Sequence, residues 1–428
     1  MDRPSGTRIR LWWERASWVL PLLGLVAGVQ LVTLVEAVDE LLESVPGLET
    51  SMSPEAATAV LAAIGGGMIT FSGFVFSFAI LIVQFGSSAY SPRMVSYFLR
   101  RRVTQWILAL FLATIAYCFM GLVTIGSQGR AQFVPRITVS VALGLLVFSL
   151  VGFIVLMHAA GSQIRVDSVL ASIGRHSRAQ LARRLPRQGT AEVVAPDPGR
   201  TPEAPDLAPV DYRGENGQIV AIDTRRLARI AHRQAITLVL DLRVGDAITR
   251  GTPIARTDAA DAPDLARAIS RCLVVDDERS LVHDPLYALR LLVDIAIRAL
   301  SPAVNDPTTA VRALDEIEGV LRSAADRRLG TVRLDLTPGL LEVSTATWDE
   351  VVDLALLEIA ECGGGQVQVT RRLVALLDDL IPDVPQDRRV ALRRHRESLE
   401  AGVAHRQLTG RALEVALRGD RQGLGGSG

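Results

Sequence analysis

Four long runs of apolar residues dominate the first part of the chain, at about residues 17–38, 56–85, 105–126 and 136–160. A helix needs about 20 residues to cross a hydrocarbon layer about 30 Å thick, so each run is long enough to span a membrane. The first run is too long, and lies too far into the chain, for a cleaved signal peptide. The pattern therefore predicts a domain of four transmembrane helices over residues 1–162, with the lipid bilayer as its partner.

The placement of arginine around these runs predicts the orientation of the chain. Arginines cluster before the first run, between the second and third, and after the fourth, whereas the loop after the first run has none. Loops rich in arginine stay on the cytoplasmic side of a membrane. Both termini are therefore expected in the cytoplasm. No charged residue lies at the centre of a run, which disfavours an ion-coupled carrier more than a passive pore.

The second run carries small and polar residues at steps of three, four and seven, which places them on one face of a helix. Small residues let membrane helices pack closely, but the same face is also suited to line a polar path. Packing is the simpler interpretation, and the sequence leaves both open. Because about 30 helical residues reach about 45 Å, this run must tilt, project or break at its three successive glycines. The face comprises Gly66, Thr70, Gly73, Ser77, Gln84 and Ser88.

Composition divides the rest of the chain into four parts. Residues 163–210 are rich in arginine and then in proline and alanine, which predicts a linker. Short apolar runs separated by glycine-containing turns predict a small β-rich module over 211–260. Helical periodicity predicts a mainly helical domain over 261–422, with a hairpin near 331–344, and a disordered tail over 423–428. The expected fold is an α-helical membrane protein with four transmembrane helices and a C-terminal α+β cytoplasmic region, which contains the β-rich module and a helical module.

One corner of the helical domain combines prolines with hydrogen-bonding side chains. Asp284 and Asp306 each precede a proline, so each is expected to cap the helix that follows it. Asn305 is suited to the turn between these helices because its side chain can bond to the backbone. The corner is explained as a helix–turn–helix connection, and the alternative is that its side chains and free amide groups bind a small anion.

The helix before this corner has only three charged residues, spaced four apart. An ion-paired ladder explains them. One carboxylate cannot neutralise two arginines, so either another acid, such as Asp306 or Asp315, completes the network, or one arginine holds an anion. The residues of this candidate anion or ligand corner are Arg290, Asp294, Arg298, Ser301, Asn305 and Asp306.

Composition also removes several classes of chemistry. Acidic and basic residues balance at 46 each, so the net charge gives no reason to expect a nucleic-acid partner. The chain has no lysine, which excludes a Schiff-base lysine, a phosphate-loop lysine and a lysine that carries biotin or lipoate. Its three cysteines and six histidines show no metal-ligand spacing. No metal, cofactor or catalytic residue is predicted, and an enzyme is the least supported class.

Two segments of the chain resemble one bacterial family closely. The first is FSGFVFSFAILIVQFGSSAYSPRMVSYFLRRRVTQ, which includes Ser91, Pro92 and Arg93, and the second is LRLLVDIAIRALSPAVNDPTTA. Both are similar to segments of the domain-of-unknown-function 2254 family of predicted integral membrane proteins, in which Tyr287 and Ala288 are often replaced by phenylalanine and glycine. The resemblance extends from about residue 10 to about residue 400. It implies a bacterial inner-membrane location, and it implies no activity, substrate or catalytic residue.

Two functions compete on these observations. The first is an oligomeric, channel-like or passive transport protein that its cytoplasmic domain gates, with the glycines near residue 66 as a hinge and a homo-oligomer as the expected assembly. The alternative is a membrane-anchored ligand-sensing or protein-binding regulatory protein without transport activity.

Overall fold

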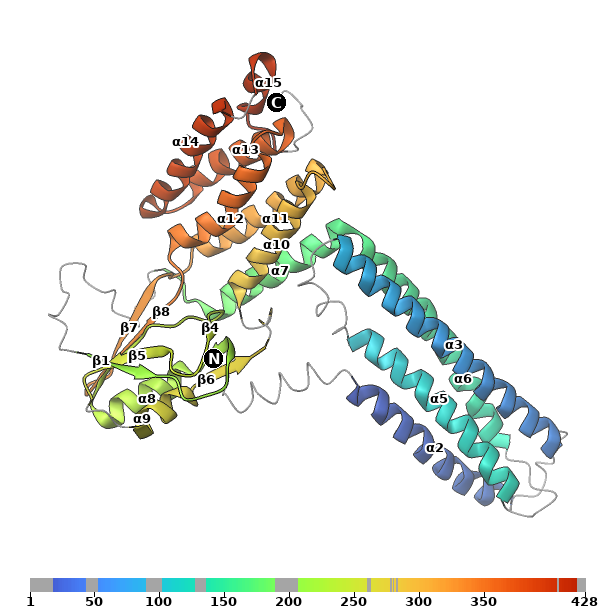
Figure 1. Ribbon diagram of the computed structural model, residues 1–428. Helices are drawn as coiled ribbons and strands as arrows, with labels where there is room; N and C mark the ends of the chain where they lie inside the picture. Colours follow the sequence, from blue (N-terminus) through green and yellow to red (C-terminus); the bar gives the residue numbers. More distant parts are fainter. Residues whose placement is uncertain are drawn as a thin grey trace. The chain divides into compact units, whose positions relative to one another are not determined.

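The computed structural model describes residues 18–43, 53–89, 102–127, 136–188, 207–259, 263–277, 279, 281, 284–405 and 408–421. The described chain divides into two compact units (Figure 1). One, the membrane unit, extends to Arg165, and the other, the C-terminal unit, begins at Val166. The expected tail over 423–428 lies outside the described residues, as do most residues of the loops between the apolar runs.

The membrane unit consists of long apolar helices: α2 (Val19–Glu43), α3 (Pro54–Ala89), α5 (Arg102–Ser127) and α6 (Arg136–Ile164). Three segments are long and apolar enough to span a membrane: Glu55–Ile82, Val103–Ile125 and Ile137–Ala159. Helix α2 contributes a shorter apolar segment, Val19–Val35. The sequence therefore located three spanning segments, and the first span stays a prediction.

Close packing in this unit depends on glycines of α2. A Cβ added to Gly24 would lie 2.3 Å from the carbonyl oxygen of Ala109, and one added to Gly28 would lie 2.3 Å from that of Ala113. Only hydrogen at these positions lets the backbones of α2 and α5 approach so closely. Aromatic rings fill the core beside α6, where Phe71 and Phe153 meet edge to face with their centroids 4.8 Å apart.

Helix α3 is continuous from Pro54 to Ala89, so it does not break at Gly65, Gly66 and Gly67. The loss of a side chain at a glycine does not remove a backbone hydrogen bond, so the helix can pass through all three. Of the three alternatives expected for this long run, only tilt and projection are compatible with the continuous helix.

The C-terminal unit contains two sheets. The larger has the strand order β1 (Ala208–Asp211), β5 (Pro253–Thr257), β3 (Thr237–Leu240), β8 (Leu340–Ser344) and β7 (Thr331–Asp335). Its strands pair antiparallel except for β3 and β8, which are parallel. The smaller, antiparallel sheet has the order β4 (Ala247–Ile248), β2 (Gly217–Ile222) and β6 (Leu273–Asp276).

The predicted hairpin exists as β7 and β8, and it turns at Pro338 and Gly339. It does not stay in the helical domain to which the sequence assigned it. Leu341 pairs with Leu238 in the larger sheet, so the hairpin completes the β-rich module from 103 residues further along the chain (341 − 238). The boundary expected at residue 260 is therefore crossed by a sheet, because the exposed edge of β3 needs a partner.

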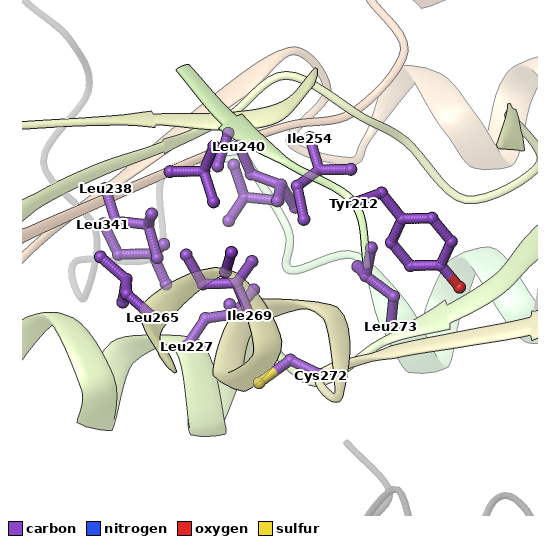
Figure 2. Packing of buried hydrophobic residues seen from close by; sticks show 14 of the residues in the cluster. Tyr212, Leu227, Leu238, Leu240, Ile254, Leu265, Ile269, Cys272, Leu273 and Leu341 are labelled. Carbon is purple, nitrogen blue, oxygen red and sulfur yellow. The ribbon is translucent and has the colours of Figure 1, made fainter. Parts of the chain in front are cut away.

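Helices α8 (Thr224–Gln234) and α9 (Pro263–Ser270) lie beside the sheets and close their core (Figure 1). Figure 2 shows Leu227 of α8 and Ile269 of α9 directed at Leu238, Leu240 and other strand residues. All of these side chains are buried.

The remaining helices form a second layer of the C-terminal unit (Figure 1). They are α7 (Val166–Arg184), α10 (Pro285–Ala299), α11 (Pro307–Ala325), α12 (Trp348–Gly363), α13 (Val367–Asp383), a 3-10 turn (Gln386–Arg388), α14 (Arg389–His405) and α15 (Gly410–Ala416).

The first half of the expected linker over 163–210 is helix α7, which packs against α10 and α11. It buries Val169, Leu170, Ile173 and Leu181, at helical spacing. The segment was assigned to a linker because its high arginine content outweighs this apolar stripe in the sequence. Residues 189–206, the part richest in proline and alanine, lie outside the described residues.

Candidate functional site

Helix α10 begins at a buried carboxylate. Asp284 accepts hydrogen bonds from the amides of Leu286 and Tyr287 at 3.0 and 3.1 Å, as the sequence predicted for a helix cap. Its other oxygen binds the guanidinium of Arg279, at 3.1 Å from Nε and 2.5 Å from Nη2. Arg279 also stacks over the ring of Tyr287, with its Cζ 5.2 Å from the ring centroid. The negative charge of Asp284 is thus fully matched inside the unit.

The ladder on α10 has a partner on a different helix. Arg290 donates to Asp294 at 2.7 Å and to both carboxylate oxygens of Glu358, on α12. The hydrogen bond to Glu358 raises the pKa of Arg290 above its usual value, and Asp294 adds to the effect. Glu358 therefore adds a second carboxylate to the ladder, for which the sequence suggested Asp306 or Asp315.

Asp315 belongs to a separate ion-pair network on α11 and α13. Its Oδ1 accepts from Nε of Arg372 at 2.8 Å, and Glu318 accepts from Nη2 of Arg372 at 2.6 Å. The side chain of Arg372 is only 4% exposed. Sequence reasoning missed Glu358 and Arg372, because pairs between helices leave no spacing signal along the chain.

The turn between α10 and α11 is held by bonds to its own backbone. Ser301 donates its hydroxyl to the carbonyl of Arg298 at 2.7 Å. Asp306 caps α11, because its Oδ1 accepts from the amide of Thr309 at 3.1 Å and its Oδ2 from the hydroxyl of the same residue at 2.6 Å. Both side chains of the expected anion corner therefore have structural partners.

Asn305 occupies the tightest position of this turn, with a φ of +48°. Asparagine tolerates this left-handed conformation better than most residues. Its side-chain oxygen accepts from Gln366 Nε2 at 3.1 Å, which ties the turn to the start of α13. The structure places Ser301, Asn305 and Asp306 in this turn and Arg290, Asp294 and Arg298 along α10. The described contacts of the three turn residues favour a structural role for them.

The polar face of α3 faces away from its neighbours in the described membrane unit. Thr70 and Ser77 donate their hydroxyls to the carbonyls of Gly66 and Gly73, at 3.3 and 3.0 Å. A Cβ added at Gly66 or Gly73 would meet nothing within 4 Å. Gln84 is exposed, and the side chain of Ser88 lies outside the described side chains. The face that the sequence assigned to packing or to a path is therefore not used for packing among the described helices.

Two hydrogen bonds join buried polar groups inside the membrane unit. The buried hydroxyls of Thr114 and Ser149 lie 3.1 Å apart, and Tyr117 donates to the carbonyl of Thr138 at 3.1 Å. The residues that the structure describes include no cluster of three or more histidine, cysteine or acidic side chains placed to hold a metal. In the C-terminal unit, burial raises the pKa of the Cys272 thiol to about 11, which keeps it protonated and unreactive at neutral pH.

These long apolar helices with a large attached unit define the class as a membrane protein. The chain belongs to the family described as "Predicted membrane protein (DUF2254)", whose sequence model matches residues 14–379. It is also similar to uncharacterized proteins of Mycobacterium bovis and of Mycobacterium tuberculosis strain H37Rv. Each is 30% identical to it over 397 residues, which cover 89% of this chain and 74% of the relative. No solved structure matches the chain.

Proposed function

We propose that this chain is a multi-pass protein of the bacterial inner membrane that assembles into a homo-oligomer, with a channel-like passive path formed between copies and gated by the C-terminal unit. The observation that carries the proposal is the exposed face of α3. It presents Gly66, Thr70, Gly73 and Ser77 along one side of the helix, with open space over both glycines.

This face is suited to contact a second copy. Lipid tails make few van der Waals contacts with a surface of glycine and serine. Another helix can approach such a surface closely and make more of these contacts. The exposed side chains of Phe74 and Phe76 border the face, and they are suited to lipid or to a neighbouring helix. Homo-oligomerisation through α3 follows from this combination.

The positions of the polar side chains favour a path between copies over a path through the interior of one copy. The described interior of the unit is apolar and packed, and the buried hydroxyls of Thr114, Ser149 and Tyr117 have partners within it. The exposed face of α3 carries the polar side chains of Thr70, Ser77 and Gln84. The centres of the apolar runs carry no charged residue, which favours passive passage over ion-coupled transport.

Chain connectivity supports gating by the C-terminal unit. Only Arg165 separates the end of α6 from the start of α7. Helix α7 is fixed in the C-terminal unit by a hydrogen bond from Ser177 to the carbonyl of Pro285 at 3.0 Å and an ion pair from Arg178 to Glu316 at 2.8 Å. A rearrangement of α10 or α11 would therefore act on the chain one residue away from α6.

The test combines assembly with flux. Purified protein in liposomes is expected to cross-link as an oligomer and to pass ions under voltage, tension or osmotic shock. Gly66→Leu and Gly73→Leu should weaken both, because they fill the face of α3. Gly144→Leu is the matched control on α6, where an added Cβ also meets nothing within 4 Å.

Silent bilayers under all three stimuli would contradict the channel and favour the regulatory alternative. A monomer in native-like lipid, or equal effects of the three leucine variants, would contradict assembly through α3.

A further inference from the structure

Helix α8 has an unusual charge distribution. Its eleven residues include four arginines and one histidine, and no acidic residue. Arg225, Arg229 and Arg233 are exposed and spaced four apart, so they form one stripe along the helix, which we call the α8 arginine stripe.

Packing does not account for this stripe. The opposite face of α8 buries Leu227 and Ala231 in the core that it shares with the sheets (Figure 2 shows Leu227). His232 lies at hydrogen-bond distance, 3.1 Å, from the carbonyls of Leu336 and Pro338. These contacts hold the helix in place without any of the three arginines.

Several other helices of the same unit contain ion pairs at this spacing. Four such ion pairs are recorded: Arg290 with Asp294, Glu318 with Arg322, Arg396 with Glu400, and Glu414 with Arg418. Among the residues that the structure describes, no ion pair is recorded for any arginine of the α8 stripe. Like charges at this spacing repel and weaken a helix, so the three arginines carry a local energetic cost on α8.

The positive surface extends beyond α8. Arg213 and Arg271 are both exposed. The amide of Arg213 donates to the hydroxyl of Ser270 at 3.1 Å, and the amide of Asp223 donates to the carbonyl of Cys272 at 2.9 Å, which places both arginines beside the start of α8. Asp223 itself is occupied as the cap of α8, where it accepts from the amide of Arg226.

We propose that the α8 arginine stripe binds the anionic phospholipid headgroups of the membrane that holds the chain's own apolar helices. Arginine recognises phosphate oxygens with paired hydrogen bonds. The C-terminal unit starts one residue after α6, so it stays close to a lipid surface at a high effective concentration, and a weak attraction per charge is enough to dock it.

The structure also defines the type of binding. The apolar side of α8 is buried against the sheets, so this helix has no exposed apolar face to insert between acyl chains. The attraction is therefore electrostatic and is screened by salt, as the Debye length falls from about 10 Å at 0.1 M to about 3 Å at 1 M.

The test uses the full chain in lipid discs. A fluorescent donor is attached at Gln234→Cys, an exposed position at the end of α8, in a Cys362→Ser background, because Cys118 and Cys272 are buried. Discs contain phosphatidylcholine alone or with phosphatidylglycerol, and both carry an acceptor on a neutral lipid headgroup. Energy transfer should be higher with phosphatidylglycerol, and this gain should disappear at high salt.

Replacing Arg225, Arg229 and Arg233 together by glutamine should lower the docked-to-undocked ratio about fivefold per arginine at low salt, the equivalent of about 1 kcal/mol for each charge near an anionic surface. The matched control replaces Arg250, Arg393 and Arg411, which are exposed and have no ion pair recorded in the described part of the chain, and it should retain the signal. Circular dichroism melts check that both variants fold.

Equal energy transfer in the two kinds of disc, or equal losses in the two triple variants, would overturn the proposal. So would binding of a short RNA or DNA duplex through the same three arginines without any response to phosphatidylglycerol, because the partner would then be a nucleic acid. If a triple variant fails to fold, the parent protein still tests the proposal. Its gain in energy transfer with phosphatidylglycerol should disappear as the salt concentration rises, and a gain that salt does not change would contradict electrostatic docking.

Discussion

At the scale of single residues, Asp284 connects local and long-range structure. One oxygen caps α10, and the other holds Arg279, whose guanidinium reaches the loop that contains Gly245. A Cβ on Gly245 would lie 2.1 Å from Nη2 of Arg279, and its φ of +98° also favours glycine. The start of the helical layer and a turn of the smaller sheet are therefore fixed by one buried carboxylate and its arginine.

Asp284→Ala is expected to destabilise the C-terminal unit by about 2–4 kcal/mol, because it removes a helix cap and leaves Arg279 without its carboxylate. The side chain of Asp284 is 5% exposed, so water cannot replace what is lost. Amide hydrogen exchange of α10 in the full chain would measure the change. Glu414→Ala is the control, since its pair with Arg418 is exposed and should contribute below about 0.5 kcal/mol. Similar losses in both variants would contradict this account.

At the scale of elements, glycine has opposite roles in two membrane helices. Gly24 of α2 lets the helix approach the backbone of α5, whereas Gly66 and Gly73 of α3 have open space in the described structure. The same residue type thus marks an interface that the chain already uses and a face for which we propose a second copy. Composition alone cannot separate these cases, because the difference lies in what is opposite each glycine.

Gly24→Ala should therefore destabilise the membrane unit by about 1–3 kcal/mol, because its Cβ meets the rigid backbone carbonyl of Ala109 and the helices must separate. Gly144→Ala should be neutral or stabilising by up to about 1 kcal/mol, because alanine is the better helix former and nothing is opposite it. Unfolding of the full chain in mixed micelles compares the two. A destabilising Gly144→Ala together with a neutral Gly24→Ala would reverse the interpretation.

The elements themselves could be predicted well where the signal is local. The helix caps at Asp284 and Asp306, each followed by a proline, are present as expected. Pairing over long sequence distances could not be predicted. The parallel contact of β3 with β8 and the contact of Arg290 with Glu358 depend on where the chain returns in space, and no spacing along the sequence encodes that. Helix α7 was missed because its arginines outweigh its apolar stripe.

At the scale of the whole molecule, the net charge does not show where the acidic and basic residues lie on the surface. Acidic and basic residues are equal in number, and the sequence therefore gave no reason to expect an anionic partner. Folding pairs many of the arginines with acids in the helical layer, while α8 gathers several that have no acid on their own helix. A protein with no net charge can thus present a basic surface to a membrane.

The number of spans decides the orientation of the whole molecule, and it depends on whether α2 crosses the membrane. Its apolar segment, Val19–Val35, is about 26 Å long as a helix, slightly short of a hydrocarbon layer of about 30 Å. Trp18 is 61% exposed at its start, where an interfacial anchor is favourable. Four arginines precede α2, and the loop after it contains acids and no arginine. These features favour a fourth span that ends outside the cytoplasm.

Compartment-specific reporters fused after Glu49 and after Gly428 are therefore expected to report opposite sides of the membrane, with the second in the cytoplasm. An even number of spans also places a reporter at Asp2 on the same side as Gly428. Reversing the arginine bias, by replacing Arg3, Arg8, Arg10 and Arg15 with glutamine, should reduce the fraction of chains in this orientation, because arginine retention in the cytoplasm is what directs α2 across. A reporter at Asp2 that shares the compartment of Glu49, opposite Gly428, would show that α2 lies at the surface and that three helices span the membrane.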